Sequence, residues 1–328
     1  MINLDASFNG RKSLFMVYTP FQGLCALNAI KQLKIVDYTF LISRGSGLRQ
    51  KQLERLLDKN GVKYTYYNPI KVTSFFSMLV KKHQEYDAIF IGDYFYGLSG
   101  YAQAALSAHR GSKLVYLDDG ASTLELFREK PRKREGGLVN YLIYFLYGVV
   151  LLIKGVGKPY FYTIFDVESK RFHVIKNELT ENDSKQTPKD IFIIGTNSKM
   201  LHFDGYTYHE LLFALNNYIK IVYPDQDIFY CPHGGDPNNE KNIEYCKKLG
   251  MKIFDTEVSV EYDFFAKKIY PKMIVGFNST ALYTLHNAYP KSKVENISFR
   301  LKDVDLEIAH SDCRLVFEKN GINTVTVI

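Results

Sequence analysis

Short apolar segments rich in β-branched and aromatic residues alternate with longer amphipathic stretches along most of this 328-residue chain. Strands that alternate with helices predict a parallel sheet whose two faces are both covered by helices. In the first half of the chain, the pattern predicts strands at residues 14–18, 38–42, 88–91 and 114–117. It predicts helices between and beside them, near residues 23–33, 49–60, 74–83 and 99–109.

A polar stretch, residues 177–189, interrupts this alternation, and its composition predicts a linker between two domains. After it, we expect strands at residues 191–194, 227–230 and 273–275, with helices near residues 208–218 and 239–249. The sequence therefore predicts an α/β protein of two doubly wound, Rossmann-like domains, residues 1–176 and 190–328, that face a cleft.

The charge balance favours anionic partners, because 42 Lys and Arg residues against 35 Asp and Glu residues give a net charge of +7. Nucleotide phosphates and acidic lipid or lipopolysaccharide surfaces fit this charge, whereas the absence of a nucleic-acid-binding motif argues against nucleic acid. The four cysteines form no CxxC pair, which predicts reduced thiols (Cys25, Cys231, Cys246 and Cys313). The first residues lack the pattern of a secretion signal, so we expect a cytoplasmic protein.

The segment Leu138–Ile153 is apolar along nearly its whole length. As a helix it would be about 24 Å long, which is shorter than the roughly 30 Å hydrocarbon core of a bilayer. Basic residues flank it, at positions 132–134 before it and at Lys154 and Lys158 after it. Two interpretations stay open: a buried core helix, or a foot that enters one leaflet of the inner face of the membrane while its flanks meet anionic head groups.

Polar motifs follow several of the predicted strands, and a doubly wound sheet binds its ligands at the carboxyl ends of its strands. These motifs are Thr19-Pro20-Phe21-Gln22, Gly92-Asp93, Asp118-Asp119-Gly120, Gly195-Thr196-Asn197, Pro232-His233 and Ser279-Thr280. Taken singly, each is typical of a turn or a helix N-cap. Their joint placement favours transfer of a sugar from a nucleotide, in which a carboxylate removes the acceptor proton and a histidine, hydroxyls and amides stabilise the departing phosphate.

The same motifs resemble those of bacterial sialyltransferases of the GT-B type, the glycosyltransferase family 52-like group of lipooligosaccharide sialyltransferases and capsule polysialyltransferases. Those families carry an acid-acid-Gly motif, a His-Pro or Pro-His motif and a Ser-Ser/Thr motif, in that order. Residues 17–22 also resemble their first strand and loop, so the resemblance runs from about Leu14 to about Asn296. One departure is that the histidine motif continues here as Gly-Gly-Asp, where relatives more often carry a basic or acidic residue.

The resemblance implies the GT-B fold, a CMP-activated sialic acid as donor and no metal or other cofactor. Asp118 would deprotonate the acceptor hydroxyl, with Asp119 as the alternate base, and His233 would protonate or bridge the leaving phosphate. Ser279 and Thr280 would bind that phosphate. The other implied donor contacts are Glu261 at the ribose hydroxyls and Gly195, Thr196, Asn197 and Pro232 at the nucleotide; the acceptor would meet Thr19, Pro20, Gln22 and Asp93.

The sequence thus predicts an inverting, metal-independent sialyltransferase that extends a lipopolysaccharide, O-antigen or capsule glycan, with galactose as the expected acceptor. It would be peripheral on the cytoplasmic face of a bacterial inner membrane. Two alternatives stay open: a GT-B transferase that uses another nucleotide sugar, and a non-catalytic protein of envelope assembly that binds nucleotides or glycans.

Overall fold

The structure is a computed structural model, and it describes residues 8–44, 47–67, 84–92, 94, 98–127, 138–179, 187–199 and 202–327. The chain divides into two compact units. Unit 1 comprises Met1–Asp119 and Glu125–Glu178, and unit 2 comprises Gly120–Leu124 and Leu179–Ile328.

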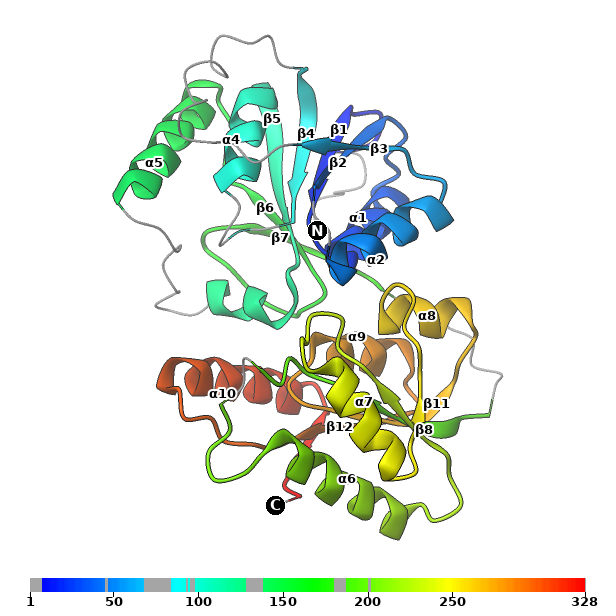
Figure 1. The fold of residues 1–328 in the computed structure, drawn as a ribbon. Helices are drawn as coiled ribbons and strands as arrows, with labels where there is room; N and C mark the ends of the chain where they lie inside the picture. The colour runs from blue at the N-terminus through cyan, green and yellow to red at the C-terminus, as the bar shows by residue number, and fades with distance from the viewer. Residues whose placement is uncertain are drawn as a thin grey trace. The chain divides into compact units, whose positions relative to one another are not determined.

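Unit 1 contains a parallel sheet of seven strands in the order β3-β2-β1-β4-β5-β6-β7 (Figure 1). The strands are β1 (Ser13–Val17), β2 (Tyr38–Ser43), β3 (Tyr64–Tyr67), β4 (Tyr86–Ile91), β5 (Ala108–Leu117), β6 (Tyr160–Thr163) and β7 (His173–Lys176). The helices are α1 (Pro20–Gln32), α2 (Leu48–Lys59), α4 (Leu98–Ser107) and α5 (Leu138–Ile153). From β1, the strands that come next along the chain are added on one side as far as β3, and the strands from β4 on are added on the other side. The position between β1 and β4 is therefore the topological switch point of the sheet.

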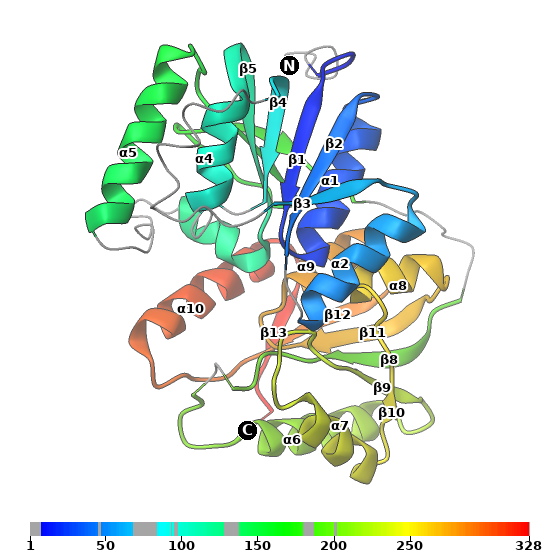
Figure 2. The same cartoon turned by 45° about the horizontal axis from the view of Figure 1, so that its top comes forward.

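Helices cover both faces of this sheet (Figure 2). Successive residues of each strand point to opposite sides of the sheet, so each strand packs against helices on both faces. On one side, Phe15 and Val17 pack with residues of α1 and α2. On the other side, Leu14 and Met16 pack with residues of α4 and α5. This double cover explains why the strands are continuous apolar runs in the sequence.

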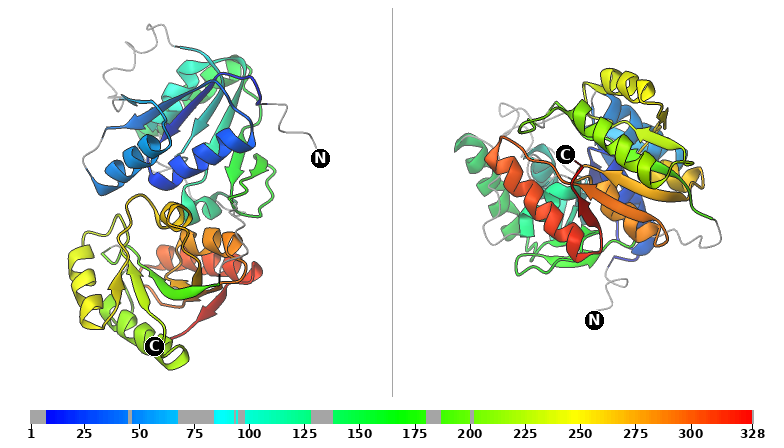
Figure 3. Two further views of the ribbon diagram at one scale, coloured as in Figure 1. Left: turned by 90° about the vertical axis from the view of Figure 1, so that its right-hand side faces the viewer. Right: turned by 90° about the horizontal axis from the view of Figure 1, so that it is seen from below.

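Unit 2 contains a second parallel sheet, of six strands in the order β10-β9-β8-β11-β12-β13. Figure 2 labels these strands, and Figure 3 shows the ribbon from two further sides. Its strands are β8 (Lys189–Ile194), β9 (Ile228–Cys231), β10 (Lys252–Ile253), β11 (Pro271–Gly276), β12 (Lys293–Ile297) and β13 (Asn323–Val325). Its helices are α6 (Tyr208–Val222), α7 (Asn239–Lys248), α8 (Val260–Ala266), α9 (Thr280–Ala288) and α10 (Val304–Lys319). The 3-10 segment η3 (Gly120–Phe127) begins in unit 2 and ends in unit 1. The switch point of this sheet lies between β8 and β11.

The predicted elements that fall on described residues are present with small shifts at their ends. The largest shift is in β5, which begins at Ala108 rather than at residue 114. Helix α1 begins at Pro20, three residues before the predicted start, because Thr19 caps it and proline is well suited to the first helical turn. The helix expected at residues 74–83 lies outside the described residues.

The apolar segment forms helix α5 with the predicted bounds, but it is not buried on all sides. Tyr144, Tyr147 and Leu151 are buried in unit 1. Five large apolar side chains are exposed by 38 to 79% (Leu142, Phe145, Leu146, Leu152 and Ile153). Among the described helices, α5 included, none is both long and apolar enough to cross a membrane.

Candidate functional site

The polar motifs lie where the sequence predicts them, after the carboxyl ends of parallel strands. In unit 1, the turn after β1 and the turn after β4 flank the switch point. Thr19 accepts a hydrogen bond from the backbone N–H of Gln22 (3.2 Å) and so serves as the N-cap of α1, with Pro20 buried in the first turn. Asp93, expected at the acceptor, lies outside the described residues.

Gln22 is buried, and its side-chain hydrogen bonds connect the turn after β1 with the acidic motif. Its side chain is only 1% exposed. Its Oε1 accepts from the backbone N–H of Tyr18 (2.8 Å), and its Nε2 donates to Asp119 Oδ1 (2.6 Å). A Cβ on Gly92 would lie 2.3 Å from Gln22 Oε1, so only glycine leaves room for this amide. The structure thus places Gln22 against Asp119, within hydrogen-bond distance of its carboxylate.

The two aspartates of the acidic motif have different surroundings. Asp118 is fully buried, and its Oδ2 accepts from the hydroxyl of Thr163 (2.9 Å) and from the backbone N–H of Ile164 (2.7 Å). It therefore ties the end of β5 to the end of β6. Asp119 is half-buried and meets Gln22 instead. Of the two aspartates, Asp119 is the more exposed residue.

Gly120 closes the acidic motif in a backbone conformation that disfavours other residues, with φ at +75°. It belongs to unit 2, where a Cβ at this position would lie 2.6 Å from Thr280 Oγ1. A side chain here would be strained and would also displace Thr280.

The turn after β8 is compact because Gly195 lies directly against the neighbouring strand. Its N–H donates to the carbonyl of Cys231 (2.9 Å), and a Cβ would lie 2.8 Å from the Tyr230 hydroxyl. Thr196 and Asn197 follow, both half-buried. Cys231 is buried, and burial raises the pKa of its thiol, which agrees with a structural role.

The turn after β9 carries Pro232 and His233, both half-buried. The carbonyl of His233 accepts from the N–H of Asp236 (3.0 Å) and from Nδ2 of Asn239 (2.6 Å). The N–H of Gly235 donates to Nδ1 of His233 (3.2 Å). Because Nδ1 accepts this bond, we assign the proton of the neutral ring to Nε2.

Asp236 organises this turn, a role that the sequence analysis did not assign. Its carboxylate is 5% exposed and accepts from Ser198 Oγ (2.8 Å), Asn242 Nδ2 (2.9 Å) and the N–H of Asn238 (3.1 Å). The signal in the sequence is an Asp two residues before an Asn in a turn, which favours a bond from the side chain to the backbone.

The turn after β11 places Ser279 and Thr280 at the start of α9. Ser279 is the N-cap and accepts from the N–H of Ala281 (3.3 Å). The preceding residue, Asn278, has φ at +50° and exchanges two hydrogen bonds with Asn296 (2.7 and 2.6 Å). Its Nδ2 also lies 2.7 Å from Nδ1 of His310. Burial lowers the pKa of His310 to about 4, so the ring is neutral and accepts from the amide.

Glu261 lies in the first turn of α8, which begins after its N-cap Ser259. The side chain is 5% exposed, and burial raises its pKa, while a hydrogen bond with Ser259 acts in the opposite direction. A carboxyl group in such a place is stabilised by hydrogen-bond donors. In unit 2 the turns with Gly195 and Ser279 thus flank the switch point, and the His233 turn is next in sheet order.

Comparison with known proteins identifies the fold. No protein-family model matches the sequence, and no curated protein sequence matches it significantly. A solved α/β-galactoside α-2,3-sialyltransferase from Photobacterium phosphoreum is similar, with 12% identity, a TM-score of 0.54, and coverage of 95% of this chain and 97% of that one. The GT-B domain of a Photobacterium damselae sialyltransferase gives 13% identity, a TM-score of 0.51, and coverage of 96% and 99%. The chain therefore has the GT-B fold, as the resemblance of the motifs implied.

Proposed function

We propose that the chain is an inverting, metal-independent sialyltransferase that moves sialic acid from CMP-sialic acid to a terminal galactose of a bacterial surface glycan. The observation that carries the proposal is the set of acid, histidine and hydroxyl groups that follow the strands near the switch point of each unit. The likeness of fold to two sialyltransferases supports the choice of donor.

Asp119 is the general base in this proposal. A base needs a carboxylate that the acceptor hydroxyl can approach within hydrogen-bond distance. Asp118 is fully buried and its Oδ2 is held by two donors, whereas Asp119 is half-buried. Gln22 orients the Asp119 carboxylate through the hydrogen bond that its Nε2 donates to Oδ1.

His233 stabilises the departing phosphate as a neutral donor. The N–H of Gly235 holds Nδ1 as an acceptor, so the ring presents its proton from Nε2. A fixed donor that meets the charge developing on the phosphate oxygen stabilises the transition state without the ring first becoming an imidazolium. Of the two roles open to this histidine, bridging the phosphate therefore fits the geometry better than full protonation.

Ser279, Thr280 and the first turn of α9 bind the phosphate in this proposal. The N-terminus of a helix offers backbone N–H groups and a positive end of the dipole to an anion. The Asn278–Asn296–His310 network holds this turn in place. Glu261 would accept from the ribose hydroxyls, which would satisfy a carboxyl group that the fold buries. These fixed donors would supply the charge stabilisation that a metal provides elsewhere.

We also propose that α5 rests on an anionic membrane. Its exposed apolar side chains lie 3, 4, 10 and 11 residues after Leu142, a spacing that puts all of them on one face of the helix. Lys154 is not free for head groups, because its Nζ donates to the carbonyls of Ala105 (2.8 Å) and Leu106 (3.1 Å). Arg110 and Lys158 are exposed near the end of the helix and provide the positive charge instead.

A transfer assay tests the proposed reaction. The full chain is incubated with a galactose-terminated acceptor and, in separate reactions, with CMP-sialic acid, UDP-galactose and UDP-N-acetylglucosamine, with and without a metal chelator. We expect transfer from CMP-sialic acid alone, unchanged by the chelator. Transfer from a UDP-sugar instead would support the alternative of another nucleotide sugar, and binding without turnover of any donor would support the non-catalytic alternative.

A further inference from the structure

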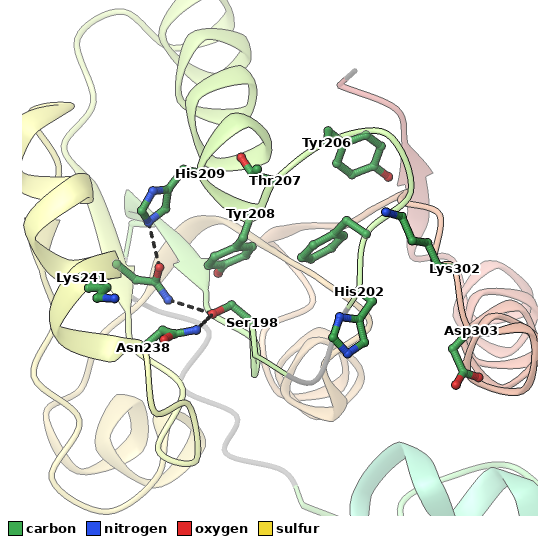
Figure 4. Close-up of a pocket in the computed structure, with 12 residues that line it drawn as sticks. Ser198, His202, Tyr206, Thr207, Tyr208, His209, Asn238, Lys241, Lys302 and Asp303 are labelled. Atoms are coloured by element: carbon green, nitrogen blue, oxygen red, sulfur yellow. Dashed lines mark hydrogen bonds between the residues drawn. The ribbon is translucent and has the colours of Figure 1, made fainter.

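Unit 2 contains a pocket of about 690 Å³ beside, but distinct from, the turns assigned to the donor (Figure 4). This volume falls within the roughly 300–1,000 Å³ of small-molecule sites. None of the residues assigned to the donor by the sequence lines it. The pocket begins at Ser198, one residue after Asn197, and extends past the first turns of α6 and α7 to Lys302 and Asp303, which precede α10.

The lining of this pocket is positively charged. Lys302 and His202 lie on one side, and Lys241 and His209 lie on the other (Figure 4). Both lysines are exposed, and neither forms a salt bridge with any residue that the structure describes. Among the described residues that line the pocket, Asp303 is the only acid. The pocket therefore favours a ligand that carries negative charge.

The centre of the pocket combines aromatic rings with neutral polar groups. Phe203 and Tyr208 are stacked, with ring centroids 6.0 Å apart and planes inclined by 10°. Close to them, the side chains of Ser198 and Asn238 are joined by a hydrogen bond (3.3 Å) within the network of Asp236. Aromatic surface beside a few fixed hydroxyl and amide groups suits a polyhydroxylated ring, which has both an apolar face and many hydroxyls.

We propose that this pocket binds an acidic saccharide, a sugar ring that carries a carboxylate or a phosphate, independently of the donor nucleotide. The ring packs near Tyr208 and hydrogen-bonds to Ser198 and Asn238, and its anionic group meets Lys302 or Lys241. The inference does not depend on which nucleotide sugar the protein uses, because it rests on the pocket alone.

The test is equilibrium binding to the full chain by calorimetry, with no donor present. The probes are N-acetylneuraminic acid and glucose 6-phosphate, which distinguish a carboxylate from a phosphate, and their neutral counterparts, the methyl ester of N-acetylneuraminic acid and glucose. We expect at least one of the anionic sugars to bind about tenfold or more tightly than its neutral counterpart, since a hydrogen bond to a charged group is roughly twice as strong as a neutral one.

Variants then locate the bound sugar. Lys302→Gln and Lys241→Gln each remove one charge from the pocket, and at least one of them should weaken binding about tenfold. Lys319→Gln is the matched control: it removes an exposed lysine at the far end of α10, a 16-residue helix and so about 24 Å long, and should leave the affinity unchanged. Thr280→Val, in the phosphate turn, should also have no effect.

Four results would overturn the proposal. The first three are failure of both anionic sugars to bind at millimolar concentration, equal affinity for the neutral sugars, and unchanged affinity in both pocket variants. Displacement of the bound sugar by CMP or UMP would place it in the nucleotide site and would overturn the claim of a separate pocket.

Discussion

The bond between Gln22 and Asp119 allows the proposed base to be tested without touching the base itself. Gln22→Met keeps the length of the side chain but removes both hydrogen bonds. The charge-assisted bond to Asp119 is worth about 1.5–3 kcal/mol, and an unsatisfied backbone N–H at Tyr18 costs about 1–3 kcal/mol. We therefore expect the free energy of unfolding to fall by about 2.5–6 kcal/mol in total.

The catalytic effect of Gln22→Met should exceed its effect on substrate binding. A carboxylate displaced by about 1 Å can cost on the order of 100-fold in rate, so we expect kcat to fall about 10- to 100-fold with KM nearly unchanged. The assays are urea denaturation and steady-state transfer, both on the full chain. Gln22→Glu complements this variant, because it keeps the acceptor for Tyr18 but places a second carboxyl group against Asp119.

The pH dependence of Gln22→Glu has a definite sign. Two adjacent carboxyl groups retain a shared proton in the folded state at a pH where the unfolded chain has lost it. The folded state then binds more protons, so the stability of this variant relative to the original protein should fall as pH rises above about 4.3.

Gln32→Met is the matched control, on the same helix. Gln32 donates to the carbonyl of Lys176 (2.8 Å) and accepts from the hydroxyl of Tyr162 (2.7 Å), and it has no bond to the acidic motif. It should lower stability but leave kcat of the folded protein intact. If Gln22→Met keeps full kcat, or if Gln32→Met lowers kcat equally, the argument that Gln22 positions Asp119 is wrong.

Three further predictions concern other parts of the chain. Asp119→Asn should abolish transfer and lower the free energy of unfolding by only about 1 kcal/mol, because the bond from Gln22 then meets a neutral acceptor, whereas Asp118→Asn should chiefly destabilise unit 1. Kinetics and urea denaturation separate the two, and the reverse pattern would restore Asp118 as the base. The unfolded chain protonates His310 near pH 6.5 but the folded protein only near pH 4, so the free energy of unfolding should fall by about 2–3 kcal/mol as the pH drops between these values. In denaturation curves measured across this range, His310→Gln should make the free energy of unfolding less dependent on pH. Phe145→Asp, on the exposed face of α5, should reduce sedimentation with anionic vesicles, while the equally charged change Phe213→Asp, at an exposed position of α6, should not; equal sedimentation of both variants would contradict the membrane contact.

The sequence predicted the elements whose pattern is local and long. Strands such as β1 and β4 are continuous apolar runs because both faces of the sheet are covered, and such runs can be recognised from the sequence alone. Several strands of two to five residues were missed, since so few residues give too little periodicity (β3, β6, β7, β10, β12 and β13). Helix α10 was also not predicted. The bounds of α5 followed from its apolar composition, but composition does not tell which side of a helix is covered.

The candidate site could be predicted in position but not in detail. Motifs at strand ends follow from topology, and the described ones do lie there. Which of two adjacent aspartates is buried depends on a contact 46 residues away in the chain, between Asp118 and Ile164. The same holds for His310, which supports the phosphate turn from a helix 32 residues beyond Asn278. Such long-range partners leave no signal in a single sequence.

The most direct test of the central claim is the structure of the product formed from CMP-sialic acid and a galactose-terminated acceptor. NMR of the isolated product should show sialic acid joined to the galactose with inversion at the anomeric carbon, and Asp119→Asn should form none. Transfer of a different sugar, retention of configuration, or full product formation by Asp119→Asn would contradict the account.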